Sequence, residues 1–444
     1  MMKQDNPWID RFGPVLSEAD ICERVRVGAR PLDGLSKLPA EQAVTDLGER
    51  LTKVFVPTAQ VVSVLAGFVG MARAYSASAY PNLGHYVRQI YKVQSGKASR
   101  MPTCLTGLAG VGKSELLKAL DKVMPEDADL RIPDYSGLRV TSLLSFVVQP
   151  QLGAPGVLRQ RTAEDFSDLP SGGLNAHNIY RDGVTLMTAD EFQAVTASGS
   201  ANTVATKILL KMAQIGPPLI FCANYSLVHS LWKRPQQERQ RLLSNPVIIH
   251  PEAPDSEDWI STLTELCKVA PRVIRIDPKR DAGDIHAYTA GIKRAVVALL
   301  SAAYRLARTN GHDHFGMTEI TQAYATAEFC THRNDVEELT RQALGSGGRD
   351  RRAALDLVCP FPGARQQRQV VVVANKMRES YEDRLNEEHL RSSLTRAERE
   401  GLEARAVKPA AKKTSASVTR LPKPGSRREE LLAGQTDFLN GLPR

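Results

Sequence analysis

One eight-residue stretch, Gly107-Leu-Ala-Gly-Val-Gly-Lys-Ser114, constrains this chain more than any other feature. It fits G-x-x-x-x-G-K-[ST] at every fixed position, which is the pattern of a loop that wraps nucleotide phosphates. Residues 103–106 before it predict a short strand, and residues 114–120 after it predict a helix with leucines on one side. Strand, glycine loop and helix, in this order, are the context that a phosphate-binding loop requires.

The residue types in this loop suit an anion. Glycines let backbone N–H groups turn inward, and the N-terminus of the next helix adds partial positive charge. We expect Lys113 to reach the β- and γ-phosphates of ATP, and Ser114 to hold Mg²⁺. The predicted cofactor-binding residues are Gly107, Leu108, Ala109, Gly110, Val111, Gly112, Lys113, Ser114 and Glu115.

Size and composition narrow the class of protein. A chain of 444 residues is long enough for two or three domains, and 42% hydrophobic residues suffice for a sizeable core. No run is expected to reach the apolar length of a membrane span, and the first residues lack the apolar stretch of a secretion signal. The six cysteines are scattered without a C-x-x-C pair, which argues against zinc and disulfides. These features predict a cytoplasmic protein without a membrane segment.

The net charge of +9 is unevenly placed. Residues 405–428 contain eight Lys and Arg and no Asp or Glu, so the rest of the chain carries a net charge of only +1. The sequence therefore predicts a nearly neutral folded body, which could bind nucleic acid only through a local basic patch.

Changes of pattern along the chain predict its domains. Strands alternate with helices in the centre, which predicts an α/β fold with a parallel sheet covered on both faces. Strands are expected at 138–148, 183–188, 219–223 and 246–250, and helices at 56–75, 83–93, 201–214, 288–308, 318–330 and 332–344. The predicted parts are a helical N-terminal extension (1–54), an α/β nucleotide-binding domain (55–252), a helical lid (253–345), a charged helical extension (346–404) and a disordered basic tail with an apolar end (405–444).

Polar residues near the ends of two predicted strands suit phosphate chemistry. Asp190 and Glu191 follow one strand, where Asp190 would support Mg²⁺ and Glu191 would orient and polarise the attacking water. Asn224 ends the next strand, and its amide could contact the γ-phosphate or the water. The alternative interpretations are a surface acidic turn and an ordinary turn asparagine.

Three arginines are candidates for stabilising transition-state charge. Arg239 and Arg241 lie in a basic segment, and one of them could reach the phosphate site of a neighbouring subunit. Arg241 is preferred because the apolar pair Leu242-Leu243 follows it. Arg294, preferred over Lys293, could contact the γ-phosphate as the lid closes. A solvated helix surface is the alternative for each, and part of the basic segment could face DNA phosphates.

Together these motifs resemble an AAA+ ATPase over residues 55–345. Within that class the chain is most similar to the TnsC-like and TniB-like regulators of cut-and-paste transposons. The similarity lies in Asp190-Glu-Phe-Gln193, in the segment from Arg239 to Pro251, and in the Ala-rich segment 288–311 that ends in Asn-Gly.

This resemblance implies an ATPase that uses hydrolysis as a switch and assembles on double-stranded DNA as a ring or helical filament. Its implied partners are a transposase, a target-selection protein and further copies of itself. Two alternatives stay open: another DNA-linked AAA+ ATPase, such as a helicase loader or clamp loader-like factor, and a signalling NTPase that does not bind DNA.

Overall fold

The computed structural model of this chain describes residues 6–90, 100–132, 135–147, 176–190, 201–343 and 355–361. These residues lie in one unit that spans residues 1–378, and residues 379–444 form a second unit. Apart from 355–361, the predicted extension 346–404 and tail 405–444 therefore fall outside the described residues.

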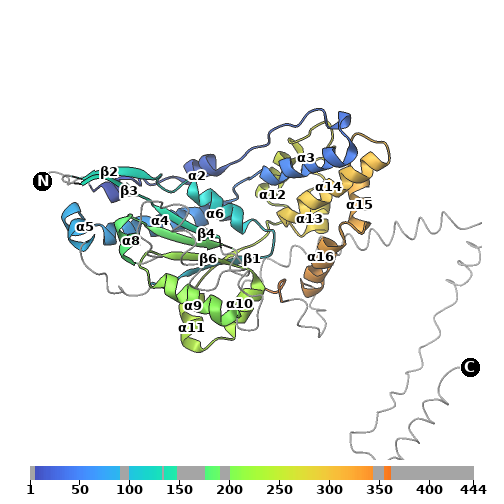
Figure 1. Cartoon of the computed structure of the whole chain (residues 1–444). Helices are drawn as coiled ribbons and strands as arrows, with labels where there is room; N and C mark the ends of the chain where they lie inside the picture. The colour runs from blue at the N-terminus through green and yellow to red at the C-terminus, as the bar shows by residue number, and fades with distance from the viewer. Residues whose placement is uncertain are drawn as a thin grey trace, which may run out of the picture. The chain divides into compact units, whose positions relative to one another are not determined.

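A five-stranded parallel sheet forms the centre of the α/β part, with the strand order β4-β5-β6-β1-β7 (Figure 1). The strands are β1 Thr103–Gly107, β4 Leu143–Val147, β5 Leu186–Asp190, β6 Leu219–Ala223 and β7 Asn245–Ile249. Since the strands are parallel, their carboxyl ends share one edge of the sheet. The phosphate-binding loop leaves β1 at that edge, between the ends of β6 and β7.

Helices cover both faces of the sheet, as predicted. Alternate side chains of a strand enter different cores: Cys104 of β1 packs with one cluster and Leu105 with the other. Figure 1 shows α6 on one side and α9 to α11 on the other. These helices are α6 Lys113–Asp121, α9 Ala201–Ala213, α10 Tyr225–Trp232 and α11 Gln236–Leu243.

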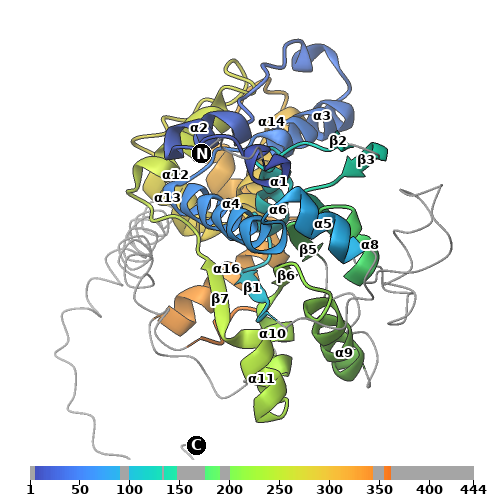
Figure 2. The ribbon, with the colours of Figure 1, turned by 90° about the vertical axis from the view of Figure 1, so that its left-hand side faces the viewer.

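The N-terminal region is helical, as its pattern predicted. It contains α1 Pro7–Asp10, α2 Glu18–Val25, the 3₁₀ helix η1 Leu35–Lys37, α3 Ala40–Lys53, α4 Ala59–Ala79 and α5 Leu83–Ile90, and the short α8 Ala176–Arg181 lies beside α5. Figure 2 shows α4 with α1, α2 and α6 around it.

The length and mean hydropathy of α4 would by themselves allow it to cross a membrane, and no other helix in the described part of the chain passes this test. The expectation that no run reaches this length was therefore wrong, because the apolar helix continues to Ala79 with Arg73 as its only charged residue. Core helices of folded domains pass the same test. Leu65 and Phe68 of α4 are buried in the core between the helix and the sheet.

The predicted strand at 138–148 is two strands in two different sheets. β3 (Tyr135–Val140) pairs antiparallel with β2 (Ala128–Ile132), and β4 begins only after two further residues. Between β3 and β4, the N–H of Thr141 donates to the carbonyl of Asp182 at 2.8 Å. Because Asp182 is distant in sequence, the apolar run at 138–148 could not predict that the strand is interrupted here.

The strand predicted at 183–188 begins later, at Leu186, and ends at Asp190. Gly183 has a φ of +67° in the turn after α8, which delays the strand. The other predicted strands and α9 agree with the structure to within a residue or two.

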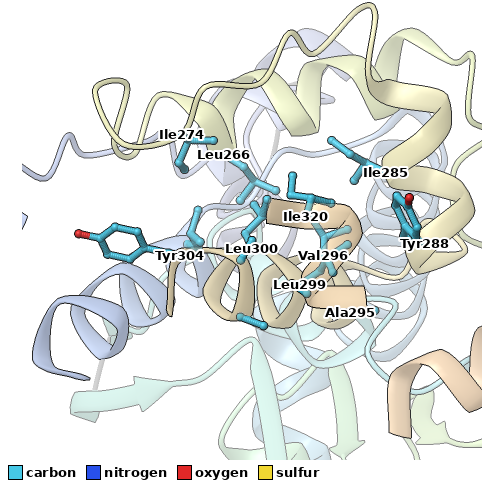
Figure 3. Packing of buried hydrophobic residues seen from close by; sticks show 14 of the residues in the cluster. Leu266, Ile274, Ile285, Tyr288, Ala295, Val296, Leu299, Leu300, Tyr304 and Ile320 are labelled. Atoms are coloured by element: carbon cyan, nitrogen blue, oxygen red, sulfur yellow. The ribbon is translucent and has the colours of Figure 1, made fainter. Parts of the chain in front are cut away.

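The lid is helical, as predicted. Its helices are α12 Glu257–Cys267, α13 Ala282–Thr289, α14 Lys293–Thr309, α15 Met317–Ala325 and α16 Cys330–Ala343. The predicted helix at 288–308 was wrong at its start, because Ala290 and Gly291 have positive φ angles of 50° and 67° and separate α13 from α14. Figure 3 shows side chains of α14, among them Val296 and Leu299, packed against Ile285 and Ile320.

The N-terminal helix α3 belongs to the core of this lid. Its buried Leu47 and Leu51 lie in the same apolar cluster as Val296 and Leu299 of α14, and α3 lies along α14 (Figure 1). Arg308 of α14 donates to backbone carbonyls before α3. The lid is therefore built from two segments that are far apart in the sequence.

Candidate nucleotide-binding site

The glycine loop has the geometry that its sequence predicted. Gly110 and Gly112 have φ angles of +80° and +110°, in the left-handed region that side chains other than glycine rarely adopt. α6 starts at Lys113, directly after Gly112. Gly107 lies so close to β7 that an added Cβ would be 2.5 Å from the carbonyl oxygen of Ile249. Its lack of a side chain therefore lets β1 and β7 approach.

Lys113 lies over its own loop. Its ammonium donates to the carbonyl oxygens of Gly107 at 3.0 Å and of Leu108 at 2.8 Å. A phosphate is a stronger acceptor for an ammonium than a neutral carbonyl is. The side chain is thus placed to exchange these carbonyls for phosphate oxygens.

A cavity of about 480 Å³ joins the loop, the sheet edge and the lid. This volume is within the range of ligand pockets, roughly 300–1,000 Å³. Its walls contain nine of the predicted site residues: Ala109, Gly110, Gly112, Lys113, Ser114, Glu115, Asp190, Asn224 and Arg294. The remaining lining residues are Thr52, Cys222, Lys293, Val297 and Ala298.

Asp190 is the last residue of β5 and faces this cavity beside Cys222 of β6. Burial raises the pKa of the Cys222 thiol far above its usual range, and the neighbouring Asp190 raises it further. The thiol is therefore an uncharged neighbour of the carboxylate. Glu191, the predicted base, lies outside the described residues.

Asn224 begins a helix at the edge of the cavity. It caps α10, where its side-chain oxygen accepts the N–H of Leu227 at 3.0 Å, and it also lines the cavity. Since an asparagine side chain has two amide hydrogens besides this oxygen, the capping role fixes its orientation and keeps its donors for a ligand.

Arg294 brings the lid onto the loop. Its backbone N–H donates to the carbonyl oxygen of Gly110 at 3.3 Å, and a Cβ on Gly110 would lie 2.6 Å from the Cβ of Arg294. Its side chain is exposed and lines the cavity. The predicted lid arginine thus meets the phosphate-binding loop.

The other two predicted arginines lie on α11 and do not line the cavity of their own chain. Arg239 is half-buried, with its guanidinium carbon 5.4 Å from the centre of the Trp232 ring and a hydrogen bond to the Trp232 carbonyl. Arg241 is exposed. A role toward a neighbouring subunit therefore stays a prediction for both.

A second cavity, of about 70 Å³, adjoins the loop on the side of β7. It lies between the linker Val54–Val56, the end of β7 and α12 of the lid, and its walls are mainly apolar. Its volume is far below the range of ligand pockets, so a nucleotide base would enter only after the lid moves.

Among the residues at these cavities, sequence reasoning gave no role to Thr52 and preferred Arg294 over Lys293. Thr52 comes from α3, whose place in the lid could not be read from its own pattern. Lys293 lines both cavities. Its position immediately before Arg294 was the available signal, but the predicted helix starts five residues too early.

His286 joins the lid to the end of β7. Its Nε2 makes a 2.8 Å hydrogen bond with the carbonyl oxygen of Glu252, and its ring meets Trp259 edge-on. Burial lowers the pKa of His286 to about 4, against an ordinary value of 6.5. The imidazole is therefore neutral in the folded protein at neutral pH.

Acid is expected to destabilise the protein through His286. Between pH 6.5 and about 4 the unfolded chain binds a proton that the folded chain does not. The free energy of unfolding should then fall by about 3 kcal/mol over this window. Urea unfolding at pH 7.5 and at pH 4.5 measures the loss, and H286Q should show a smaller difference between the two. An equal pH dependence in wild type and variant would contradict this assignment.

The residues at the large cavity fit Mg²⁺ and a polyphosphate. Glycine N–H groups, Lys113 and a lid arginine supply donors and positive charge, and Ser114 and Asp190 supply the hard oxygen ligands that Mg²⁺ prefers. Within the described ranges, no group of three or more His, Cys, Asp and Glu could hold a metal ion.

Comparison with known proteins finds only distant likeness. No protein-family model and no curated protein matches the chain. Similar solved structures include the Aeropyrum pernix ORC2 protein in ADPNP–ADP complexes (15% identity, 62% of this chain and 73% of that chain, TM-score 0.37). They also include Drosophila ORC bound to DNA (11%, 74% and 80%, TM-score 0.37) and the Thermotoga maritima RuvB Holliday junction branch migration motor (12%, 65% and 76%, TM-score 0.32).

Because these TM-scores are low, the fold is assigned from the chain's own features and not from these structures. The parallel sheet ordered β4-β5-β6-β1-β7, the glycine loop after β1 and the helical lid after β7 are all present. They give this chain an α/β fold with a central parallel sheet, a glycine loop at its carboxyl edge and a helical lid, as its sequence predicted.

Proposed function

We propose that this chain is an AAA+ ATPase that binds and hydrolyses ATP with Mg²⁺. The observation that carries this proposal is the single cavity that unites Lys113, Asp190, Asn224 and Arg294, which come from three strand ends and the lid. The sequence predicts a role in nucleotide binding or hydrolysis for each of these four residues, and each prediction comes from a different motif. A structural glycine turn would not gather them.

Each side chain then has a definite role. Lys113 leaves its loop carbonyls for the β- and γ-phosphates, and Ser114 and Asp190 hold the metal. Mg²⁺, when bound, neutralises charge on the phosphate oxygens. Glu191 accepts the proton of the attacking water. Asn224 donates its amide hydrogens to the γ-phosphate or to that water, since its oxygen is already used in capping α10.

We assign the arginine in trans to Arg241 rather than Arg239. Arg239 already stacks on Trp232, whereas Arg241 is exposed, with Leu242 and Leu243 buried behind it. An exposed guanidinium held by buried neighbours is suited to project into a second copy of this chain. The active enzyme is accordingly a ring or helical filament.

The biological role that we propose is regulation of DNA transposition in the cytoplasm. The ATP-bound oligomer would assemble on double-stranded DNA and link a target-selection protein to a transposase. The sequence resemblance at Asp190–Gln193, Arg239–Pro251 and residues 288–311 supports this role. The basic segment 405–428 is suited to DNA or to an acidic partner surface.

Duplex DNA binding with and without nucleotide tests this role. We expect a slowly hydrolysed ATP analogue to tighten binding of the full chain to a fluorescent duplex about tenfold or more relative to ADP, and electron microscopy to show rings or filaments. A K113A protein should lose the difference. A chain ending at residue 404 should keep its ATPase activity and bind DNA or partner less tightly. Equal DNA binding with and without nucleotide would count against this role, and no DNA binding in either state would favour a signalling NTPase.

A further inference from the structure

Lys293 is a half-buried cation that the proposed reaction does not use. It is the first residue of α14, its ammonium donates to the carbonyl oxygen of Val54, and it lies 5.7 Å from the centre of the Phe55 ring. A lysine ammonium has three N–H donors. The bond to the Val54 carbonyl uses one of these donors, so the ammonium can donate further hydrogen bonds.

The charge of Lys293 is not neutralised locally. Among the residues that the structure describes, none of the ion pairs includes this lysine. Burial lowers its pKa, the nearby Glu115 acts in the opposite direction, and Lys118 lowers it further. Glu115 is itself paired with Lys118 at 2.9 Å. A half-buried ammonium without an ion-pair partner in the described part of the chain favours a bound anion.

The position of Lys293 identifies which anion. Lys293 and Gly112 are common to both cavities, the large one beside Lys113 and the small apolar one beside β7. If the β- and γ-phosphates lie in the large cavity and the base lies in the small one, the α-phosphate, which is bonded to the nucleoside, lies where the two cavities meet. Loop N–H groups cradle the α- and β-phosphates at this same place.

We propose that Lys293 binds the α-phosphate of the nucleotide and so holds the lid on any bound nucleoside di- or triphosphate. This inference rests on the proposed nucleotide site. Arg294, in contrast, lines only the large cavity and is placed for the γ-phosphate. The two neighbouring cations would then have separate roles, since Lys293 senses that a nucleotide is present and Arg294 senses whether it is a triphosphate.

The division predicts two different patterns of binding loss. A charged hydrogen bond to phosphate corresponds to about a tenfold change in affinity or more. K293M should therefore weaken Mg-ADP and the Mg-complex of a slowly hydrolysed ATP analogue by the same factor, about tenfold or more each. R294M should weaken the ATP analogue more than ADP. Isothermal calorimetry on the full chain measures all four dissociation constants.

The matched control is K122M. Lys122 also donates from a helix to a backbone carbonyl of the N-terminal region, that of Val25 at 3.4 Å, but it lines neither cavity. The K122M protein should bind both nucleotides as the wild type does. This control therefore distinguishes a loss of phosphate binding from the loss of a contact that holds the N-terminal region. K293R should restore most of the affinity for both nucleotides.

The outcomes are distinct. Equal losses in K293M, with K122M unchanged, support the assignment. If K293M binds ADP within twofold of wild type while K113A does not bind it, Lys293 is only a structural contact and the inference is wrong. A loss for the ATP analogue alone would move Lys293 to the γ-phosphate and also overturn it. If the wild type binds neither nucleotide, the proposed nucleotide site fails and this inference fails with it.

Discussion

The K113A protein is expected to lose ATP binding almost completely. Lys113 is the cation at the start of α6, and its donors face loop carbonyls that phosphate oxygens would replace. Loss of two charge-assisted hydrogen bonds corresponds to about 3 kcal/mol or more, which is on the order of a hundredfold in affinity. Equilibrium binding of a fluorescent ATP analogue to the full chain measures the change.

A second lysine on the same helix provides the control. Lys118 is largely exposed and pairs with Glu115 at 2.9 Å, so K118A should keep wild-type affinity. Circular dichroism and melting temperature, measured for both variants, show whether a loss of affinity comes with a loss of folding. Normal ATP affinity in K113A would refute the assignment of the phosphate-binding loop.

The E191Q protein is expected to bind ATP normally and to hydrolyse it slowly. Glutamine keeps the size of the side chain but cannot accept a proton from water, and general base catalysis contributes about a hundredfold or more to rate. Asp190, one residue earlier, lies at the cavity that holds Lys113 and Ser114. Phosphate release at saturating ATP, measured beside binding, separates the two effects.

An exposed acidic residue of the lid tests whether the loss is specific. Glu257 lies in the first turn of α12 and lines neither cavity, so E257Q should keep wild-type turnover. Unchanged hydrolysis in E191Q would show that another residue is the base. A combined loss of binding and turnover would indicate instead that Glu191 helps to hold the nucleotide.

The local elements could be predicted because their signals are local. The glycines of the loop follow a fixed pattern, the leucines of α6 repeat at helical spacing, and β6 is a short apolar run directly followed by the polar Asn224. Asp190 and Asn224 line one cavity because parallel strands place their carboxyl ends at a common edge, and Arg294 lines the same cavity from the lid. Here sequence spacing and chain topology lead to the same place.

The elements that sequence could not give depend on distant contacts. The break between β3 and β4 is stabilised by Asp182, some forty residues later along the chain. The apolar side of α3 predicts that the helix packs against another element, but it does not identify that element, which is α14. From the sequence alone Lys293 could be an ordinary surface lysine, because its contacts with Phe55 and Val54 are visible only in the tertiary structure. Each case needs tertiary structure, which no local pattern contains.

The path of the chain through the lid limits how the lid can turn. The chain passes between the α/β part and the lid between Val25 and Leu35, again at Val54–Phe55 after α3, and again at Glu252 after β7. Several connections between the same two parts restrain their relative movement more than a single linker would. We therefore expect only small rotations of the lid, in which α14 and α3 move together and the distance between Arg294 and Gly110 changes.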